Sequence, residues 1–173
     1  IKAGTSDIIV AGGMESMTNA PYLLPKVRGG MRMGHAEVKD HMFLDGLEDA
    51  YEKGKLMGCF ADKAAEKYNF SREEQDAFAI ESVNRAQKAI QEGWFKNEIV
   101  SVSVEGRKET VTVDTDESPL KAKVDKISSL RPAFGKDGTV TAANASSISD
   151  GAAALVMMSE AKAAQKGVEP IAK

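Results

Sequence analysis

The single cysteine of the chain, Cys59, is the first candidate for a nucleophile, because a thiolate attacks activated carbonyl carbons. A thiol becomes reactive when a helix N-terminus or a basic neighbour lowers its pKa. Cys59 stands near the start of an expected helix, but Met57 and Phe60 give it apolar neighbours and no histidine is close in the sequence. We therefore interpret Cys59 as a small packed residue and not as a catalytic one.

Two histidines and one serine are the other side chains considered for chemistry. His35 and His41 have no cysteine or histidine partner at a metal-binding spacing, so neither is expected to bind a metal. Ser16 follows Gly12 and Gly13, yet the run lacks the G-x-S-x-G pattern of an esterase and the glycine spacing of phosphate-binding loops. We predict a tight turn at Gly12–Gly13, no catalytic residue and no metal ligand, and we disfavour a nucleotide-binding oxidoreductase.

The segment from Thr141 to Ala154 is the most unusual part of the sequence, because almost every residue in it is small. Small residues let a ligand or another backbone approach closely, and the Asn and Ser side chains add hydrogen-bonding groups without bulk. The pattern suits a slot for a narrow ligand that carries amides. It suits tight packing between strands equally well, and both interpretations stay open at this point.

The composition limits the class of protein. The chain has 173 residues with 42% hydrophobic residues, enough for one domain with a core. Its net charge is -3 and it has no dense basic cluster, so nucleic acid is not an expected partner. One cysteine excludes an internal disulfide framework, and no apolar run approaches the roughly 20 residues of a membrane span.

The N-terminal residues IKAGTSDIIV include neither an initiator Met nor a signal-peptide profile. We therefore expect the chain to be a piece of a longer protein. The single cysteine and the missing leader favour a cytoplasmic location, although a lost N-terminus could have held an organelle signal.

Three helices are expected from periodicity and from their end signals. Apolar residues recur at three- and four-residue spacing from Met57 to Tyr68. The next helix begins with Ser71 and Glu74 in the pattern of a capping box, and Gly93 ends it. The third covers residues 160–166.

Extended segments flank these helices. Residues 8–11 and 152–158 are expected to be buried strands, and residues 99–104 are expected to form a hairpin with residues 110–113. Residues 114–119 have a turn-rich composition. Two buried strands that bracket a long stretch of helices, hairpin and loops indicate a sheet domain with an inserted lobe, and such lobes often cover an active site.

Four motifs together resemble the thiolase family: AGGMESM (11–17), SREEQDAFA (71–79), RPAF (131–134) and NASSISDGAAA (144–154). They occur in the family's order and cover essentially the whole chain. The resemblance implies an α/β fold, namely part of a layered α-β-α-β-α domain with an inserted α+β loop domain. Residues 1–17 would end the N-terminal half, residues 18–146 would form the loop domain that binds coenzyme A, and residues 147–173 would return into the N-terminal half.

The resemblance also implies a reaction. Members of the family join two acetyl-CoA molecules into acetoacetyl-CoA and CoA, or run the reverse, through an acetyl-cysteine. Their catalytic residues lie in C-x-S, G-H-P, C-x-G and N-E-A-F motifs, and none of these motifs occurs in this chain. We therefore expect the catalytic groups to lie outside this piece, which alone would be inactive. Coenzyme A would be substrate and product, with no further cofactor.

What the resemblance assigns to this chain is coenzyme-A-binding surface. Leu130, Ala133 and Phe134 would line the slot for adenine and pantetheine, and Ala142 and Ser146 would meet the pantetheine, with the Ser146 hydroxyl bonding an amide. Two further residues are implied: Met57 would bound the acyl pocket and Lys126 would meet the adenine or phosphate end. Leu56 stands where short-chain members commonly have histidine, which removes a polar contact near the coenzyme.

The implied partners are acetyl-CoA or acetoacetyl-CoA, the rest of the thiolase chain, and further copies of the protein in a dimer or tetramer. An alternative is a free-standing, non-catalytic module that binds coenzyme A or mediates assembly. The loop domain of thiolases also helps to join dimers into tetramers, so it could act in interaction alone.

Overall fold

The computed structural model describes residues 1–173 and contains two compact units. The first comprises Ile1–Gly46 and Ile148–Lys173, and the second comprises Leu47–Ser147. The predicted domain limits of 1–17, 18–146 and 147–173 remain a prediction, because compact units do not by themselves mark the domains of a fold.

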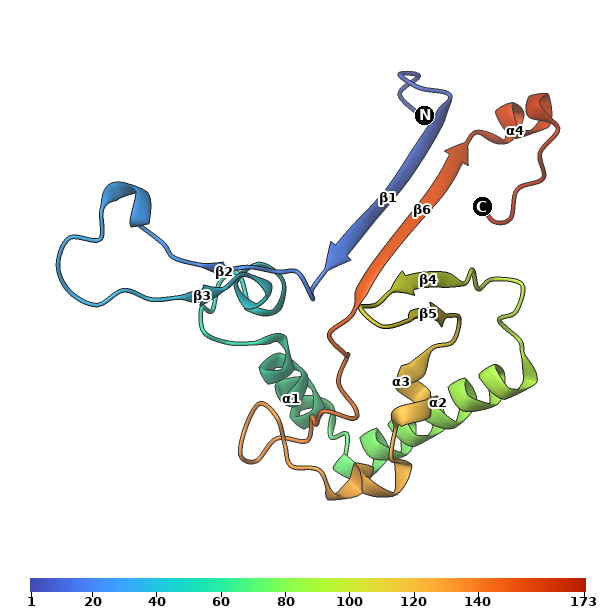
Figure 1. Cartoon of the computed structure of the whole chain (residues 1–173). Coiled ribbons are helices and arrows are strands. Elements are labelled where there is room, and N and C mark those ends of the chain that lie inside the picture. The colour runs from blue at the N-terminus through green and yellow to red at the C-terminus, as the bar shows by residue number, and fades with distance from the viewer. The chain divides into compact units, whose positions relative to one another are not determined.

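A two-stranded antiparallel sheet forms the first unit's main element (Figure 1). Strand β1 (Ile8–Ser16) pairs with β6 (Asp150–Met158) along its whole length. The predicted turn at Gly12–Gly13 is wrong, because both glycines lie within β1. A Cβ atom on Gly12 would overlap the carbonyl oxygen of Ala153 on the partner strand, so glycine here serves a close approach of two backbones.

The predicted burial of these two strands is also wrong within this chain. Val10 is 70% exposed and Leu155 is 67% exposed. The physical reason is that the sheet has two strands, and no layer of the first unit covers its faces. The apolar runs at residues 8–11 and 152–158 correctly indicated strands, but no other element of the first unit covers those strands.

The remaining elements of the first unit are short. Strands β2 (Tyr22–Leu23) and β3 (Lys39–Asp40) form a second antiparallel pair. The short turns η1 (Val27–Gly29) and η2 (Phe43–Leu47) follow β2 and β3, and η2 runs into the first residue of the second unit. Helix α4 (Glu160–Lys166) begins at the Ser159 cap and ends at a left-handed Gly167, which confirms the prediction.

Two helices carry the second unit. Helix α1 (Met57–Tyr68) ends at a left-handed Asn69, and helix α2 (Arg72–Glu92) ends at a left-handed Gly93. The predicted capping box is confirmed: the Glu74 N–H donates to the Ser71 hydroxyl at 3.1 Å, and the Ser71 N–H donates to the Glu74 carboxylate at 2.8 Å. These two bonds satisfy backbone donors that the first turn of a helix leaves free.

A hairpin and two short helical segments complete the second unit. Strands β4 (Val102–Glu105) and β5 (Thr110–Val113) form the predicted hairpin, although the first strand begins at Val102 and not at Ile99. Helix α3 (Glu117–Lys121) replaces the predicted turn, because the Asp116 carboxylate accepts the Ser118 N–H at 3.1 Å and caps a helix start. The 3-10 helix η3 (Val124–Ser129) follows and leads into the RPAF motif.

The core of the second unit is small and built mainly from alanine and β-branched residues, namely Ala65, Ala79, Ala89, Ile127 and Val140.

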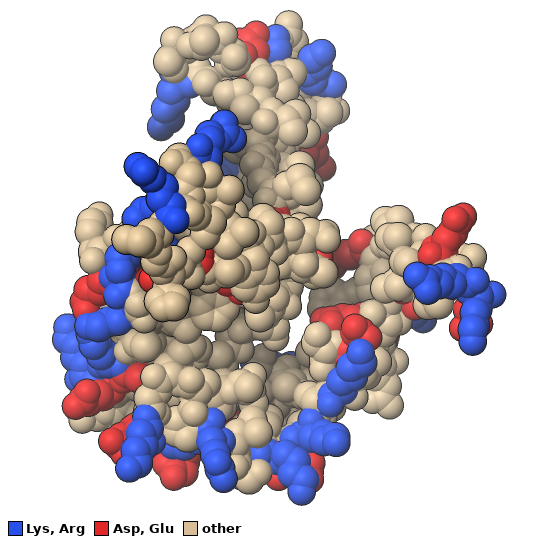
Figure 2. Space-filling model, turned by 60° about the vertical axis from the view of Figure 1, so that its left-hand side comes forward, with Lys and Arg blue, Asp and Glu red and all other residues tan.

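On the face drawn in Figure 2, Lys and Arg side chains are interspersed with Asp and Glu. None of the helices combines the length and the apolar character that crossing a bilayer requires.

Candidate functional site

All seven predicted coenzyme-A contacts lie in the second unit. They fall in three places: the start of α1, the stretch from η3 into the RPAF motif, and the turn that follows Thr141. The predicted contacts at these three places are, in the same order, Met57; Lys126, Leu130, Ala133 and Phe134; and Ala142 and Ser146.

The ring of Phe134 joins the RPAF motif to α1. It lies so close to the backbone of Gly58 that a Cβ atom on this glycine would overlap the ring. Met57, the neighbour of Gly58, has a side chain that is 45% exposed. The start of α1 and the RPAF motif therefore form adjacent walls, and the absence of a side chain at position 58 is what allows it.

The RPAF motif is also bonded to the segment that precedes the small-residue turn. The Ala133 N–H donates to the Val140 carbonyl at 2.9 Å. Residues 139–143 form no strand, and a turn begins at Ala142. The side chains of Ala133, Ala142 and Ser146 are exposed, so all three are accessible to a ligand in this structure.

The carboxylate of Asp62 ties the loop between these segments to α1. One oxygen of Asp62 accepts the N–H groups of Thr139 at 2.8 Å and Val140 at 2.9 Å. The other lies so close to Gly138 that a Cβ atom there would overlap it. A charged acceptor holding two backbone donors makes a strong anchor, so the approach to the turn is fixed against the helix.

A second carboxylate, that of Asp76 in α2, is buried with 4% of the residue exposed. Its Oδ2 accepts the Nε–H of Arg72 at 2.7 Å, and its Oδ1 accepts the Nδ2–H of Asn144 at 3.2 Å. The Asn144 Oδ1 accepts the Thr141 N–H at 2.6 Å, and Thr141 is fully buried. This network reaches from the first turn of α2 into the small-residue turn.

Two of the predicted contacts are less closely joined to the rest. The Lys126 side chain is exposed in η3, and its Nζ lies 3.8 Å from the carboxylate of its neighbour Asp125. Ser146 stands at the end of the second unit, and its side chain makes no hydrogen bond in the structure. The assignment of all seven residues to coenzyme A remains a prediction.

Sequence reasoning missed the residues that hold these walls: Gly58, Asp62, Arg72, Asp76 and Asn144. The i, i+4 spacing of Arg72 and Asp76 on an expected helix could have indicated an ion pair. The partnership of Asp76 with Asn144 spans 68 residues, and no local pattern in one sequence indicates it.

The environment of Cys59 does not resemble that of an activated nucleophile. Cys59 is half-buried in the first turn of α1 and lines an open cavity of about 770 Å³. The polar groups around this cavity include Asp62, Lys63 and Lys136, and no histidine lines it. No cluster of three or more His, Cys, Asp or Glu side chains is arranged as a metal site requires.

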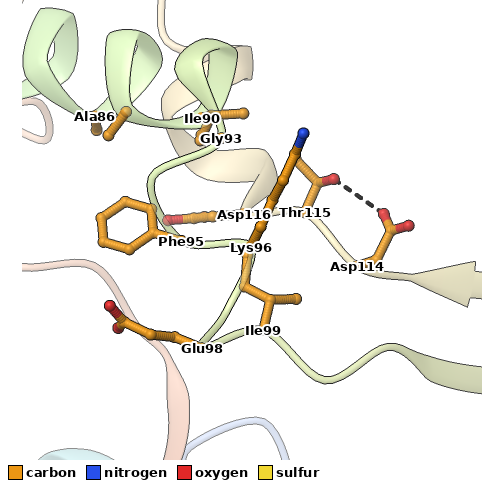
Figure 3. A pocket seen from close by; sticks show the side chains of 11 residues that line it. Ala86, Ile90, Gly93, Phe95, Lys96, Glu98, Ile99, Asp114, Thr115 and Asp116 are labelled. Atoms are coloured by element: carbon orange, nitrogen blue, oxygen red, sulfur yellow. Dashed lines mark hydrogen bonds between the residues drawn. The ribbon is translucent and has the colours of Figure 1, made fainter.

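A separate cavity of about 500 Å³ lies beside the C-terminal half of α2 (Figure 3). Its apolar lining comes from residues such as Ile90, Phe95 and Ile99, and Figure 3 shows the Thr115 hydroxyl bonded to the Asp114 carboxylate, at 2.9 Å. None of the seven predicted contacts lines this cavity, so the structure does not connect it with the walls described above.

Comparison with known proteins identifies the family. The family described as "Thiolase, N-terminal domain" matches residues 1–161 of this chain. The chain belongs to the thiolase family. This confirms the resemblance that the four motifs indicated, and with it the α/β fold class of thiolases.

The thiolase relatives carry one recurring name. Acetyl-CoA acetyltransferase IB of Candida tropicalis is 51% identical over all of this chain and 43% of the relative's length. The acetyl-CoA acetyltransferase of Saccharomyces cerevisiae is 48% identical over 99% of this chain and 44% of its own. This chain thus spans less than half the length of the curated relatives that it matches.

Solved thiolase structures agree with this fold. The acetyl-CoA acetyltransferase from Syntrophomonas wolfei matches with a TM-score of 0.87 and 45% identity, over 97% of this chain and 42% of that one. The Bacillus anthracis acetyl-CoA acetyltransferase matches with a TM-score of 0.85 and 42% identity, over 96% of this chain and 42% of that one.

Proposed function

We propose that the full-length protein is an acetyl-CoA C-acetyltransferase, which joins two acetyl-CoA molecules into acetoacetyl-CoA and CoA and also runs the thiolytic reverse. The observation that carries the proposal is the identity of about half of all residues to acetyl-CoA acetyltransferases along the entire chain. The matched region includes the segments around Phe134, Asn144 and Met57, which contacts in the structure join.

In this proposal the chain supplies a slot and not the reacting groups. Pantetheine is a thin chain with two amides, so it needs apolar walls and a few fixed polar partners. Leu130, Ala133, Phe134 and Ala142 would provide the walls, and the exposed Ser146 hydroxyl is free to bond an amide.

The two ends of the substrate would meet the remaining predicted contacts. Met57, at the first position of α1, would limit the acyl group. Lys126 would meet the adenine or phosphate end, because its ammonium group is exposed and can approach an anion. The Met57 side chain, the Ser146 hydroxyl and the Lys126 ammonium group would then match the acyl group, the pantetheine amides and the nucleotide end of an acyl-CoA.

The bond-forming step would use a cysteine thiolate outside residues 1–173. That sulfur would attack the acetyl-CoA carbonyl and release CoA as its thiolate. The enolate of a second acetyl-CoA, formed by loss of a proton to a base, would then attack the acetyl-cysteine and free the thiol. A thioester brings its own leaving group, so we propose coenzyme A as substrate and product, with no separate cofactor.

The cellular location and the oligomeric state of the full-length protein belong to the same proposal. We propose that the full-length protein is a cytoplasmic homo-oligomer, a dimer or a tetramer, on the basis of the family and of its single cysteine in 173 residues. Size-exclusion chromatography with light scattering measures the oligomeric state directly, and a purely monomeric full-length protein would contradict this part.

The direct test is thiolysis of acetoacetyl-CoA by the full-length protein. We expect turnover in the presence of CoA, and an acetylated cysteine outside residues 1–173 when the reaction with acetyl-CoA is quenched and mapped by mass spectrometry. The Cys59→Ala variant should keep its turnover. Acetylation of Cys59, together with loss of turnover in that variant, would overturn the proposal. Binding of CoA without turnover would instead favour the non-catalytic module.

A further inference from the structure

Asp76 is the one charged residue that the structure buries. A buried carboxylate is costly unless hydrogen-bonding partners compensate it, and removing one partner of such a group costs more than removing an exposed one. Asp76 has a partner on each oxygen, the Arg72 guanidinium on Oδ2 and the Asn144 amide on Oδ1. No buried side-chain polar atom in the structure lacks a partner.

The two partners of Asp76 bind the backbone at two different walls of the proposed slot. Arg72 binds the entry to the RPAF motif, and Asn144 binds the turn that begins at Ala142. The Nη2 group of Arg72 donates to the carbonyl oxygens of Ile127 at 3.2 Å and Leu130 at 2.9 Å, at the entry to the RPAF motif. One guanidinium therefore binds the carboxylate and the loop backbone at the same time, which its planar fork permits.

Asn144 acts in the same way on the other wall. Its Nδ2 group donates both to Asp76 and to the Thr139 carbonyl at 3.2 Å, while its Oδ1 accepts the Thr141 N–H. These bonds shape the turn that begins at Ala142, and Ser146 follows two residues after Asn144. The amide therefore sets where the predicted pantetheine contacts of this turn stand.

We infer that Arg72, Asp76 and Asn144 form a positioning relay, which sets the spacing between the two walls of the pantetheine slot from the first turn of α2. None of the three is among the predicted contacts, so they act through the residues that they hold. This inference rests on the proposed function. Since a displacement of about 1 Å in a positioning group has large effects on binding and rate, a relay of hydrogen bonds that starts from a buried carboxylate is a suitable device.

The relay predicts a particular kinetic signature. A variant with a loosened relay should bind acetyl-CoA weakly, because the pantetheine walls no longer match their ligand. It should still react normally with S-ethyl thioacetate, a small thioester that carries the acetyl group but neither pantetheine nor nucleotide. A defect in folding would lower both reactions together.

The matched pair Arg72→Lys and Arg85→Lys tests this in the full-length protein. Both arginines lie in α2 and pair with a carboxylate four residues away, but the Arg85–Glu81 pair is exposed and touches no wall. Lysine cannot bind a carboxylate and two carbonyl groups as a guanidinium does. We expect Arg72→Lys to raise the KM for acetyl-CoA about tenfold and Arg85→Lys to leave it unchanged.

The rate of cysteine acetylation by S-ethyl thioacetate is the second readout, and it should stay within about twofold of the parent's in both variants. Asn144→Asp, which places a carboxylate beside Asp76, should reproduce the Arg72→Lys pattern. An unchanged KM for acetyl-CoA in Arg72→Lys and Asn144→Asp overturns the relay. Equal losses with both thioesters overturn it as well, because they indicate damage to the fold.

The relay and the proposed function can fail separately. If the parent protein does not turn over, the proposed function fails, and the dissociation constant of CoA from calorimetry then tests the relay. About tenfold weaker CoA binding by Arg72→Lys supports the relay in that case. Equal binding by parent and variant, or no CoA binding by the parent, overturns it.

Discussion

The Gly58–Phe134 contact shows how a residue without a side chain can make room for an aromatic ring. The aromatic ring occupies the space that a Cβ atom would need. Position 58 lies in the first turn of α1, where no positive φ angle requires glycine. The requirement for glycine therefore comes from packing, and it can be tested by a single methyl group.

We predict that Gly58→Ala displaces the Phe134 ring in the full-length protein. Overpacking of this kind costs about 1–3 kcal/mol of unfolding free energy, and the KM for acetyl-CoA should rise because the ring is a predicted wall of the slot. Denaturant unfolding and steady-state kinetics measure the two effects. Gly46→Ala is the control, since nothing lies within 4 Å of a Cβ atom there. Identical behaviour of both variants would show that the ring yields at no cost.

At the residue scale, sequence reasoning proposed ligand contacts but did not find the residues that hold them in place. Ser146 and Phe134 were assigned from motifs, and such an assignment needs no geometry. The Asp62 carboxylate accepts the Thr139 N–H, 77 residues away in the sequence. The Asn144 side-chain amide donates to the Asp76 carboxylate, 68 residues away, and only the folded chain brings these partners together. Long-range polar contacts are what a single sequence does not display.

At the scale of elements, the capping box of α2 is the best example of a local rule that holds. Ser71 and Glu74 are three residues apart, and each side chain bonds the backbone N–H of the other. These bonds are local, so the sequence alone was enough to predict them. By contrast, the local rule that a glycine pair marks a turn fails at Gly12 and Gly13, because both pair with residues of the distant strand β6.

We predict that Ser71→Ala lowers the unfolding free energy of the full-length protein by about 1 kcal/mol, because the first turn of α2 loses its side-chain acceptor. Chemical denaturation measures this loss. The exposed Ser101, which makes no side-chain hydrogen bond, supplies the control Ser101→Ala. If both variants lose equal stability, the cap contributes nothing specific.

The end of the β1–β6 pair has a pH-sensitive bond. The Asp150 carboxylate accepts the Thr18 N–H at 2.9 Å, and this bond holds the pKa of Asp150 below its ordinary value. A lowered pKa in the folded state means that folding favours the ionised form. The stabilisation is therefore complete above the ordinary Asp pKa of about 3.9 and is lost as the pH falls through the lower, folded value.

We predict that Asp150→Asn removes this part of the acid dependence. Between neutral pH and about pH 4, the unfolding free energies of parent and variant should follow parallel curves, because neither gains a proton at this position. Below that, the parent should lose stability more steeply than Asp150→Asn. Glu169→Gln, at an exposed and unpaired carboxylate, is the control. Parallel curves at all pH values would contradict the role of the Thr18 bond.

At the scale of the whole chain, the two units differ in how much cover they provide for themselves. The second unit buries five of the six core hydrophobic residues, and the first buries only Ala163. A two-stranded sheet by itself is marginally stable in water. The sequence correctly predicted strands in residues 8–11 and 152–158, but its prediction that both are buried is wrong for this chain.

We predict that hydrogen exchange separates the two units in the 173-residue polypeptide expressed alone. Amides within α2 should be protected, because they belong to a capped helix with a packed face. Amides of β1 and β6 should exchange rapidly, and they should become protected in the full-length protein. Equal protection of β1 and α2 in the short polypeptide would show that the sheet is stable without further layers.

Arg72 directly follows the Ser71 cap, so the start of α2 both caps the helix and holds the guanidinium that binds Asp76 and the loop. Fraying of one helical turn would release the guanidinium and let both loops drift apart. A weakened helix start would then raise the KM for acetyl-CoA before it lowers the yield of soluble protein. In the proposed acetyltransferase, sequence changes near residue 71 would therefore alter the KM for acetyl-CoA and leave the reactivity of the proposed cysteine unchanged.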